Sequence, residues 1–121
     1  MVVAHCHCKD CQRASGAGHT TGAMFATAQF EITGNLAEYS LKSNAGNQVT
    51  KVFCPICGSP IYGRNDGMEK FVTVSLGTLD DSSRFEPEVA IFAYNKKAWD
   101  IMSDTLPTFL AQPAWSPENT R

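Results

Sequence analysis

The feature that most constrains this chain is residues 5–13, which read His-Cys-His-Cys-Lys-Asp-Cys-Gln-Arg. Cys6, Cys8 and Cys11 are spaced C-x-C-x-x-C and are three of the chain's five cysteines. If the first half of this segment is extended, side chains alternate between faces, so Cys6 and Cys8 share one side. A turn through residues 9 and 10 brings Cys11 to them. Three sulfur donors in one small volume indicate a zinc site with one coordination position left open for water or substrate.

The same alternation places His5 and His7 on the face opposite the cysteines. We therefore expect packing or surface roles for both histidines rather than metal ligation. Arg13 could offset thiolate charge or hold a substrate carboxylate, and Ser15 could donate a hydrogen bond to a substrate. The plain alternatives are a solvated arginine and a turn-forming serine.

A second cysteine motif lies in residues 53–60, Phe-Cys-Pro-Ile-Cys-Gly-Ser-Pro. Cys54 and Cys57 have the spacing of a zinc knuckle, in which a turn brings two sulfurs together. A thioredoxin-type redox pair is the competing interpretation, and it requires a helix that begins at the first cysteine. Gly58 and Pro60 would break such a helix, so the sequence favours metal over redox chemistry. The flanking Lys51 and Arg64 are expected to be surface charges.

Spacing alone leaves two ways to share the five cysteines. One closed four-thiolate structural site could use Cys54, Cys57 and two cysteines of the first motif. Alternatively, the first motif forms an open three-thiolate site and the later pair belongs to another site. Structural sites usually have four protein ligands, whereas catalytic sites keep a position open.

Composition limits the remaining classes of function. The chain has 121 residues, which fits one domain covering residues 1–121. Its net charge is −2, with 10 basic and 12 acidic residues, which argues against nucleic-acid binding. No segment approaches the roughly 18 apolar residues of a membrane span, and the first residues do not resemble a secretory signal. An odd number of cysteines without such a signal favours reduced thiols and a cytoplasmic location.

The secondary-structure pattern predicts an all-β domain of short antiparallel strands with few helical turns. Residues 71–76 alternate most clearly, with Val72, Val74 and Leu76 on one side. Further strands are expected at residues 19–26, 29–33, 37–41, 49–53 and 89–94, and a helical turn or two at 96–102. Tyr94 and Trp99 are expected to wall a pocket or pack in the core. The tail, with Pro107, Pro113 and Pro117, is expected to lie extended over the surface.

Three segments together resemble the glutathione-dependent formaldehyde-activating enzyme family, which includes centromere-protein-V-like members. They are residues 5–16 with the motif His-Cys-His-Cys-x-x-Cys-Gln-Arg-Ala-Ser-Gly, Phe-Cys-Pro-x-Cys-Gly-Ser-Pro at 53–60, and Val-Ser-Leu-Gly-Thr-Leu-Asp-Asp at 74–81. The resemblance covers nearly the whole chain and implies a zinc-associated β-tent fold with two metal sites. It implies that Cys6, Cys8 and Cys11 hold the catalytic zinc. Cys54 and Cys57 would be half of the ligands of a structural zinc.

The chain departs from the family at its N-terminus. Members usually carry an earlier C-x-C segment that completes the structural site, and the chain begins just before His5. The domain is therefore expected to be N-terminally short, with one or two Zn²⁺ per chain. Missing strands would expose a sheet edge and favour a homodimer.

The resemblance implies a carbon–sulfur lyase activity, such as formation of S-hydroxymethylglutathione from glutathione and formaldehyde. Glutathione would be the co-substrate, and the partner would be a small-molecule thiol adduct. The alternative, from another class, is a non-catalytic binding module in which zinc supplies only folding energy.

Overall fold

The computed structural model describes residues 2–43 and 45–111 of the chain, and β-structure dominates this part. Seven strands in it form a single sheet, and the one α-helix is short. The strands are β1 Val3–Cys6, β2 Thr20–Ala26, β3 Ala37–Lys42, β4 Gln48–Phe53, β5 Pro60–Asn65, β6 Phe71–Ser75 and β7 Val89–Ile91. The helix is α1 Lys9–Ser15, and short 3₁₀ turns are η1 Thr27–Gln29, η2 Leu76–Thr78 and η3 Ala93–Asn95. The all-β prediction is confirmed.

The strand order across the sheet is β3-β4-β5-β6-β2-β1-β7. Neighbours are antiparallel except β1 and β7, which pair in parallel through Ala4–Val89 to Cys6–Ile91. A parallel pair needs a long crossover, and here the chain between β1 and β7 contains all the other strands. The expectation of only antiparallel strands is corrected at this one pair.

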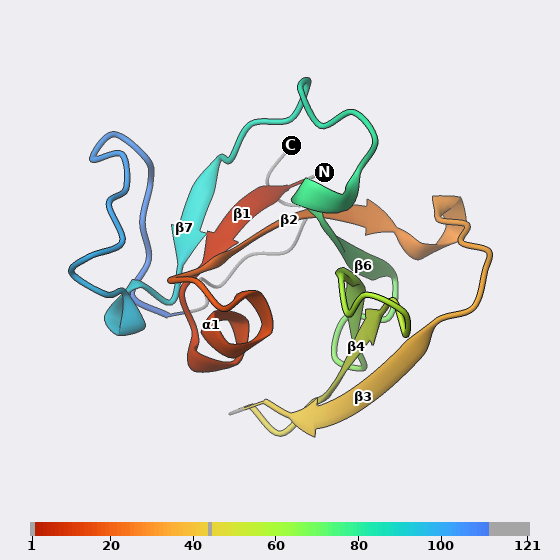
Figure 1. Ribbon diagram of the computed structural model, residues 1–121. Helices are drawn as coiled ribbons and strands as arrows, with labels where there is room; N and C mark the ends of the chain where they lie inside the picture. Colours follow the sequence, from red (N-terminus) through yellow and green to blue (C-terminus); the bar gives the residue numbers. More distant parts are fainter. Residues whose placement is uncertain (1, 44, 112–121) are drawn as a thin grey trace.

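The sheet is strongly curved (Figure 1). Its β7 and β1 end lies on the left of the view, β3 lies at the lower right, and α1 sits below β1 and β2 between these ends. Side chains from all seven strands and from α1 line one cavity, so the curved sheet partly encloses it. This curvature positions the candidate site described below.

Three of the predicted elements differ from those observed. Residues 29–33 were expected to be a strand, but η1 ends at Gln29 and the backbone then continues without regular structure. β7 ends at Ile91 because Phe92 adopts a left-handed conformation with φ of 57°. That conformation breaks strand geometry, and η3 follows. Residues 96–102 form no helix, and only a turn is present there.

The segment after Ser103 runs partly alongside β7. Thr108 forms an isolated parallel bridge with Ala90, and the Ala90 N–H donates to the Pro107 carbonyl at 2.9 Å. This pairing covers the outer edge of β7, and an extended course is confirmed for this part of the tail. Pro113 and Pro117 lie outside the described residues. No helix in the part of the chain that the structure describes is long and apolar enough to cross a membrane.

The buried apolar residues are mostly small and β-branched. Val72 and Val74 of β6 are each 5% exposed, and Ala23 of β2 is fully buried opposite Val74. A second cluster forms around Val2, Val89 and Ile91, and Cys6 and Met24 pack against it. This cluster links β1 to β7. β-branched side chains suit a pleated, half-buried surface, which explains why these segments become strands.

We predict that Val74→Ala lowers the free energy of unfolding by about 1–3 kcal/mol, because it removes buried methyl groups and leaves a cavity in β6. Thr73→Ala, at the exposed neighbouring position, should change it by less than about 0.5 kcal/mol. Urea unfolding followed by circular dichroism measures both values. Equal effects of the two substitutions would contradict the assigned faces of β6.

Candidate functional site

The first cysteine motif is drawn together by the change from strand to helix. Cys6 ends β1, Cys8 is the N-cap of α1, and Cys11 lies in the first turn of the helix. The Cys8 sulfur accepts a hydrogen bond from the Cys11 backbone N–H at 3.3 Å. The three sulfur atoms all lie within 4.8 Å of one another. The expected convergence of Cys6, Cys8 and Cys11 is therefore present, and a helical turn produces it.

Hydrogen bonds among the three sulfurs shift the pKa values of the three cysteines in different directions. Bonds from the Cys11 and Cys6 thiols hold the pKa of Cys8 down at about 2, despite partial burial, and the Lys51 ammonium adds to this effect. The bonds that Cys6 makes to Cys11 and Cys8, together with burial, raise the pKa of Cys6 far above its ordinary value. For Cys11, the bond from Cys6 lowers the pKa, but its bond to Cys8 and burial outweigh this and raise it. Hydrogen bonds from the other two cysteines thus favour the thiolate form of Cys8.

The Gln12 side chain hydrogen-bonds the backbone of the loop that carries the cysteines. Its side-chain Nε2 donates to the His7 carbonyl at 2.8 Å and to the Asn95 carbonyl at 2.9 Å. Helix α1 then ends at Gly16, whose φ of 70° is left-handed and whose N–H donates to the Gln12 carbonyl. A glycine C-cap in this conformation is a common helix end. One side chain therefore ties the cysteine loop to a segment more than 80 residues away.

The histidines of the motif lie away from the sulfurs, as expected. His7 is fully buried and forms no part of the three-sulfur group. His5 Nδ1 lies 2.8 Å from the Thr21 hydroxyl. Burial, and then the neighbouring imidazoles of His19 and His7, lower the pKa of His5.

His7 takes part in a second cluster that the sequence did not reveal. Asp100 Oδ2 lies 2.7 Å from His19 Nδ1 and 3.3 Å from His7 Nδ1. The carboxylate packs so closely against Gly18 that a Cβ there would overlap it. No spacing signal joins residues this far apart in the chain.

Cys54 and Cys57 lie in the tight turn that connects β4 to β5, and both are free thiols. The Cys54 N–H donates to the Ser59 carbonyl at 2.9 Å, and the Gly58 N–H donates to the Cys54 carbonyl at 2.8 Å. Turns rather than a helix follow Cys54, which removes the basis of the thioredoxin-type alternative. Hydrogen bonds from Ser59, and then one from Cys54, lower the pKa of the exposed Cys57.

The two cysteine motifs do not form one site. Neither Cys54 nor Cys57 belongs to the group of sulfurs around Cys8, and no third His, Cys, Asp or Glu of the described residues joins the later pair. The alternative of one closed four-thiolate site is therefore not the arrangement observed. Metal binding by Cys54 and Cys57 stays a prediction.

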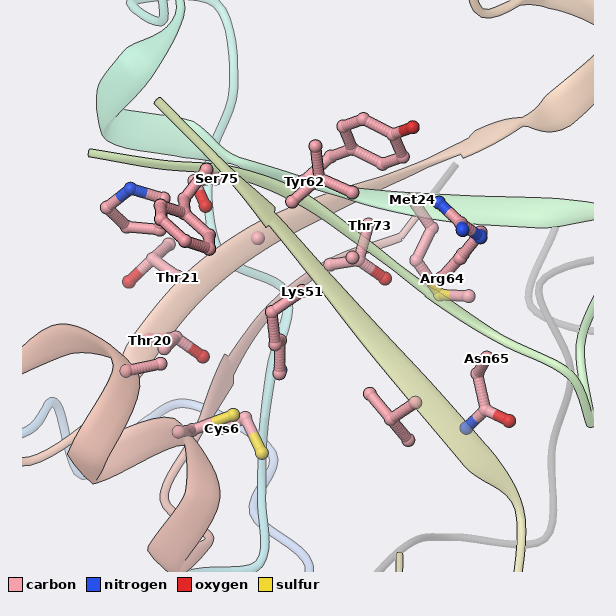
Figure 2. Close-up of a pocket in the computed structure, with 18 of the residues that line it drawn as sticks. Cys6, Thr20, Thr21, Met24, Lys51, Tyr62, Arg64, Asn65, Thr73 and Ser75 are labelled. Carbon is pink, nitrogen blue, oxygen red and sulfur yellow. The ribbon is translucent and has the colours of Figure 1, made fainter. Parts of the chain in front are cut away.

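A cavity of about 500 Å³ opens beside the first motif, with Cys6 and Cys11 in its lining. This volume falls within the range of small-molecule sites. Figure 2 shows Cys6, Thr20 and Thr21 on one side, Arg64 and Asn65 on the other, and Lys51 between them. Lys51 and Arg64 are both among the lining residues, and no aspartate or glutamate of the described residues is. The register places the Arg64 side chain on the opposite face of the sheet from Lys51, where it pairs with Glu38. An overall acidic chain thus presents the Lys51 cation next to its sulfurs.

Residues 1–95 match the family described as glutathione-dependent formaldehyde-activating enzyme. The chain belongs to this family. The match includes both cysteine motifs and all seven strands, which confirms the resemblance seen in the sequence. Membership supports a general role in glutathione-dependent formaldehyde activation. A comparison with curated proteins found no match.

Lys51, which was predicted to be a surface charge, is instead partly buried and lines the cavity of this family member, whereas the surface prediction is confirmed for Arg64, whose side chain is 44% exposed. Lys51 extends from β4, and its charge acts on Cys8. Arg64 on β5 also forms an ion pair with Glu38 at 3.2 Å. The register pairs Lys51 with Gly63 and Arg64 with Thr50, so the two side chains leave opposite faces of the sheet. Only the curvature of the sheet turned the face of Lys51 inward.

Arg13 and Ser15 lie outside the cavity lining. The Arg13 side chain is 76% exposed and approaches Asp10 at 3.8 Å, which is a weak surface pair. The Ser15 hydroxyl donates to the Gln12 carbonyl and accepts from the Ala17 N–H, so it supports the end of α1. Their roles as substrate contacts stay predictions. Tyr94 and Trp99 are 82% and 67% exposed, so they neither wall this cavity nor pack in the core.

We predict that Gly18→Ala lowers the free energy of unfolding by about 1–3 kcal/mol, because the added Cβ forces the buried Asp100 carboxylate away from both imidazoles. Gly77→Ala is the matched control, since a Cβ there meets no atom within 4 Å. Thermal unfolding of the two variants measures the difference. A Gly18→Ala variant as stable as the control would show that Asp100 is not held in the observed position.

Proposed function

We propose that the protein is a zinc-dependent carbon–sulfur lyase-like enzyme that acts on adducts of glutathione or a similar small thiol. The observation that carries this proposal is the cavity in which Cys6 and Cys11 meet the cationic side chain of Lys51 and no carboxylate of the described residues. Membership in the glutathione-dependent formaldehyde-activating family supports the choice of substrates. The reaction we propose is reversible formation of S-hydroxymethylglutathione from glutathione and formaldehyde.

The residues present fit a zinc ion. Three convergent sulfurs, one already favoured as thiolate, are the soft donor set that zinc prefers. Cys6, Cys8 and Cys11 would hold the ion and leave a fourth position toward the cavity. When bound there, zinc would lower the pKa of an incoming thiol and so increase its nucleophilicity near neutral pH.

The cavity residues suit the binding of an anionic tripeptide. Glutathione carries two carboxylates at its ends, and Lys51 is placed to pair with one of them. Lys51 acts as a point charge toward a carboxylate. Thr20, which pairs with Cys6, and Ser75 also line the cavity, and their hydroxyls can bond the peptide groups. These contacts would orient the substrate sulfur toward the cysteine motif.

The proposed reaction balances without an oxidant or reductant. The glutathione sulfur donates an electron pair to the carbonyl carbon of formaldehyde, and a C–S bond forms. The S–H proton is released when the thiolate forms, the carbonyl π electrons move to oxygen, and the oxygen takes up one proton in return and becomes the hydroxyl group. The enclosed cavity holds the two reactants together, which converts an encounter in solution into a step within one complex.

We predict that Cys8→Ser abolishes zinc binding at the first motif and the condensation of glutathione with formaldehyde, while α1 survives. Serine is a good N-cap and can keep the bond from the Cys11 N–H, whereas its hydroxyl is a poor substitute for a thiolate ligand. Zinc content by elemental analysis, the condensation rate and circular dichroism give the three readouts.

The same variant separates the enzyme from a non-catalytic zinc module. If zinc served only to stabilise the fold, Cys8→Ser would unfold the chain, because structural zinc supplies folding energy. Zinc-loaded wild-type protein that neither accelerates the condensation nor binds glutathione in calorimetry would contradict the enzymatic proposal.

We predict that Lys51→Gln raises KM for glutathione about tenfold, because a charge-assisted contact to a substrate carboxylate is lost. Lys42→Gln is the matched control, since Lys42 is an exposed residue of β3 outside the cavity lining. With 2-mercaptoethanol, a thiol without carboxylates, Lys51→Gln should leave KM unchanged. Steady-state kinetics with both thiols tests this, and an equal effect on both would argue against carboxylate recognition by Lys51.

A further inference from the structure

A second group of metal-ligating side chains lies apart from the three sulfurs. His7 follows β1, His19 precedes β2, and Asp100 lies in the loop after η3. One ligand atom from each of the three residues lies within 4.8 Å of the other two. Three separate segments of the chain thus deliver two imidazoles and one carboxylate to one place.

The spacing of these atoms suits a single small cation. Asp100 Oδ2 lies 2.7 Å from His19 Nδ1 and 3.3 Å from His7 Nδ1. Ligands around a tetrahedral zinc with bonds of about 2.0–2.1 Å are about 3.3 Å apart. Only small shifts would therefore let one ion contact all three residues.

The burial of Asp100 is the second observation. Its side chain is 10% exposed, and its ion-pair contacts among the described residues are the two histidines. No lysine or arginine of this part of the chain forms an ion pair with it. Buried charges in proteins are paired or coordinate metals, and two imidazoles and a carboxylate that converge on one place are a metal-binding donor set. A divalent cation held among them would compensate the carboxylate charge.

Hydrogen bonding within the protein also leaves His7 incompletely satisfied. Its ring is fully buried, and the two contacts of Nδ1, to the Gly18 carbonyl and to Asp100, are both long at 3.3 Å. Its other nitrogen, Nε2, is buried and has no hydrogen-bond partner. A buried polar atom without a partner is costly. The atom of His7 that faces Asp100 is Nδ1, and its two long contacts leave it available to a metal ion.

We propose that His7, His19 and Asp100 form a second metal site, which takes one divalent first-row transition cation such as Zn²⁺. Two imidazoles and a carboxylate are a harder donor set than the three sulfurs, so the two sites differ in metal preference. His19 is 24% exposed on its side chain, which gives an ion a route to the cluster. The bound ion would fasten the Asp100 segment to the loop that carries Cys6 and Cys8.

Cobalt substitution of the full-length chain tests this site independently of the enzymatic proposal. Co²⁺ held by thiolates gives an intense sulfur-to-metal charge-transfer band, whereas Co²⁺ held by imidazole and carboxylate gives none. We expect wild-type protein to bind about one more equivalent of Co²⁺ than the thiolate band reports. His19→Gln and Asp100→Asn should each lose that equivalent and keep the band.

His5→Gln is the matched control, because His5 packs edge-on against the His19 ring at 4.7 Å but belongs to neither donor group. It should keep the full metal content. His19→Gln removes a partly exposed side chain, so it should remain folded even if Asp100→Asn does not. Metal content equal in wild type and folded His19→Gln would overturn the site, whatever the outcome of the glutathione assays.

Discussion

The close approach of three sulfur atoms is the constraint on which the rest of this structure depends. Sulfurs this near one another cannot all carry charge without compensation, and hydrogen bonds from Cys6 and Cys11 lower the pKa of Cys8 while the pKa values of Cys6 and Cys11 are raised. Two local elements hold the three sulfurs in place. β1 fixes Cys6 through its pairing with β2 and β7, and the start of α1 fixes Cys8 and Cys11.

The chain segment after β7 completes this arrangement from the opposite side. Gln12 bonds the carbonyls of His7 and Asn95, and Asp100 contacts the rings of His7 and His19. The short loop between β1 and α1 therefore has sulfurs on one face and imidazoles on the other. This two-sided loop follows from the alternation of side chains along an extended backbone.

The curvature of the sheet brings side chains from distant strands together around one cavity. Antiparallel strands twist, and a seven-stranded sheet that curls brings distant strands to face one another. Lys51 on β4 thus acts on Cys8, although the sheet order places three strands between β4 and β1. The result is a cavity with sulfurs and the Lys51 ammonium but no carboxylate among its described lining residues. Such a lining favours small anionic thiols over neutral or basic molecules.

Local patterns predicted much of this fold. The alternation in residues 71–76 and 49–53 marked β6 and β4, and the C-x-C-x-x-C spacing marked the sulfur cluster. Patterns failed where backbone conformation or hydrogen bonding overrode propensity. Residues 29–33 leave the sheet after η1, and the left-handed Phe92 ends β7 early.

The sequence by itself determined the sulfur donors and their face of the strand, because both depend on spacing within a few residues. It also sufficed for the all-β class and the family. Only the tertiary structure decided that Lys51 faces a cavity, that Cys54 and Cys57 lie apart from Cys8, and that Asp100 contacts the histidines. These outcomes depend on strand order and sheet curvature, which arise from contacts between residues far apart in the chain and leave no local periodicity.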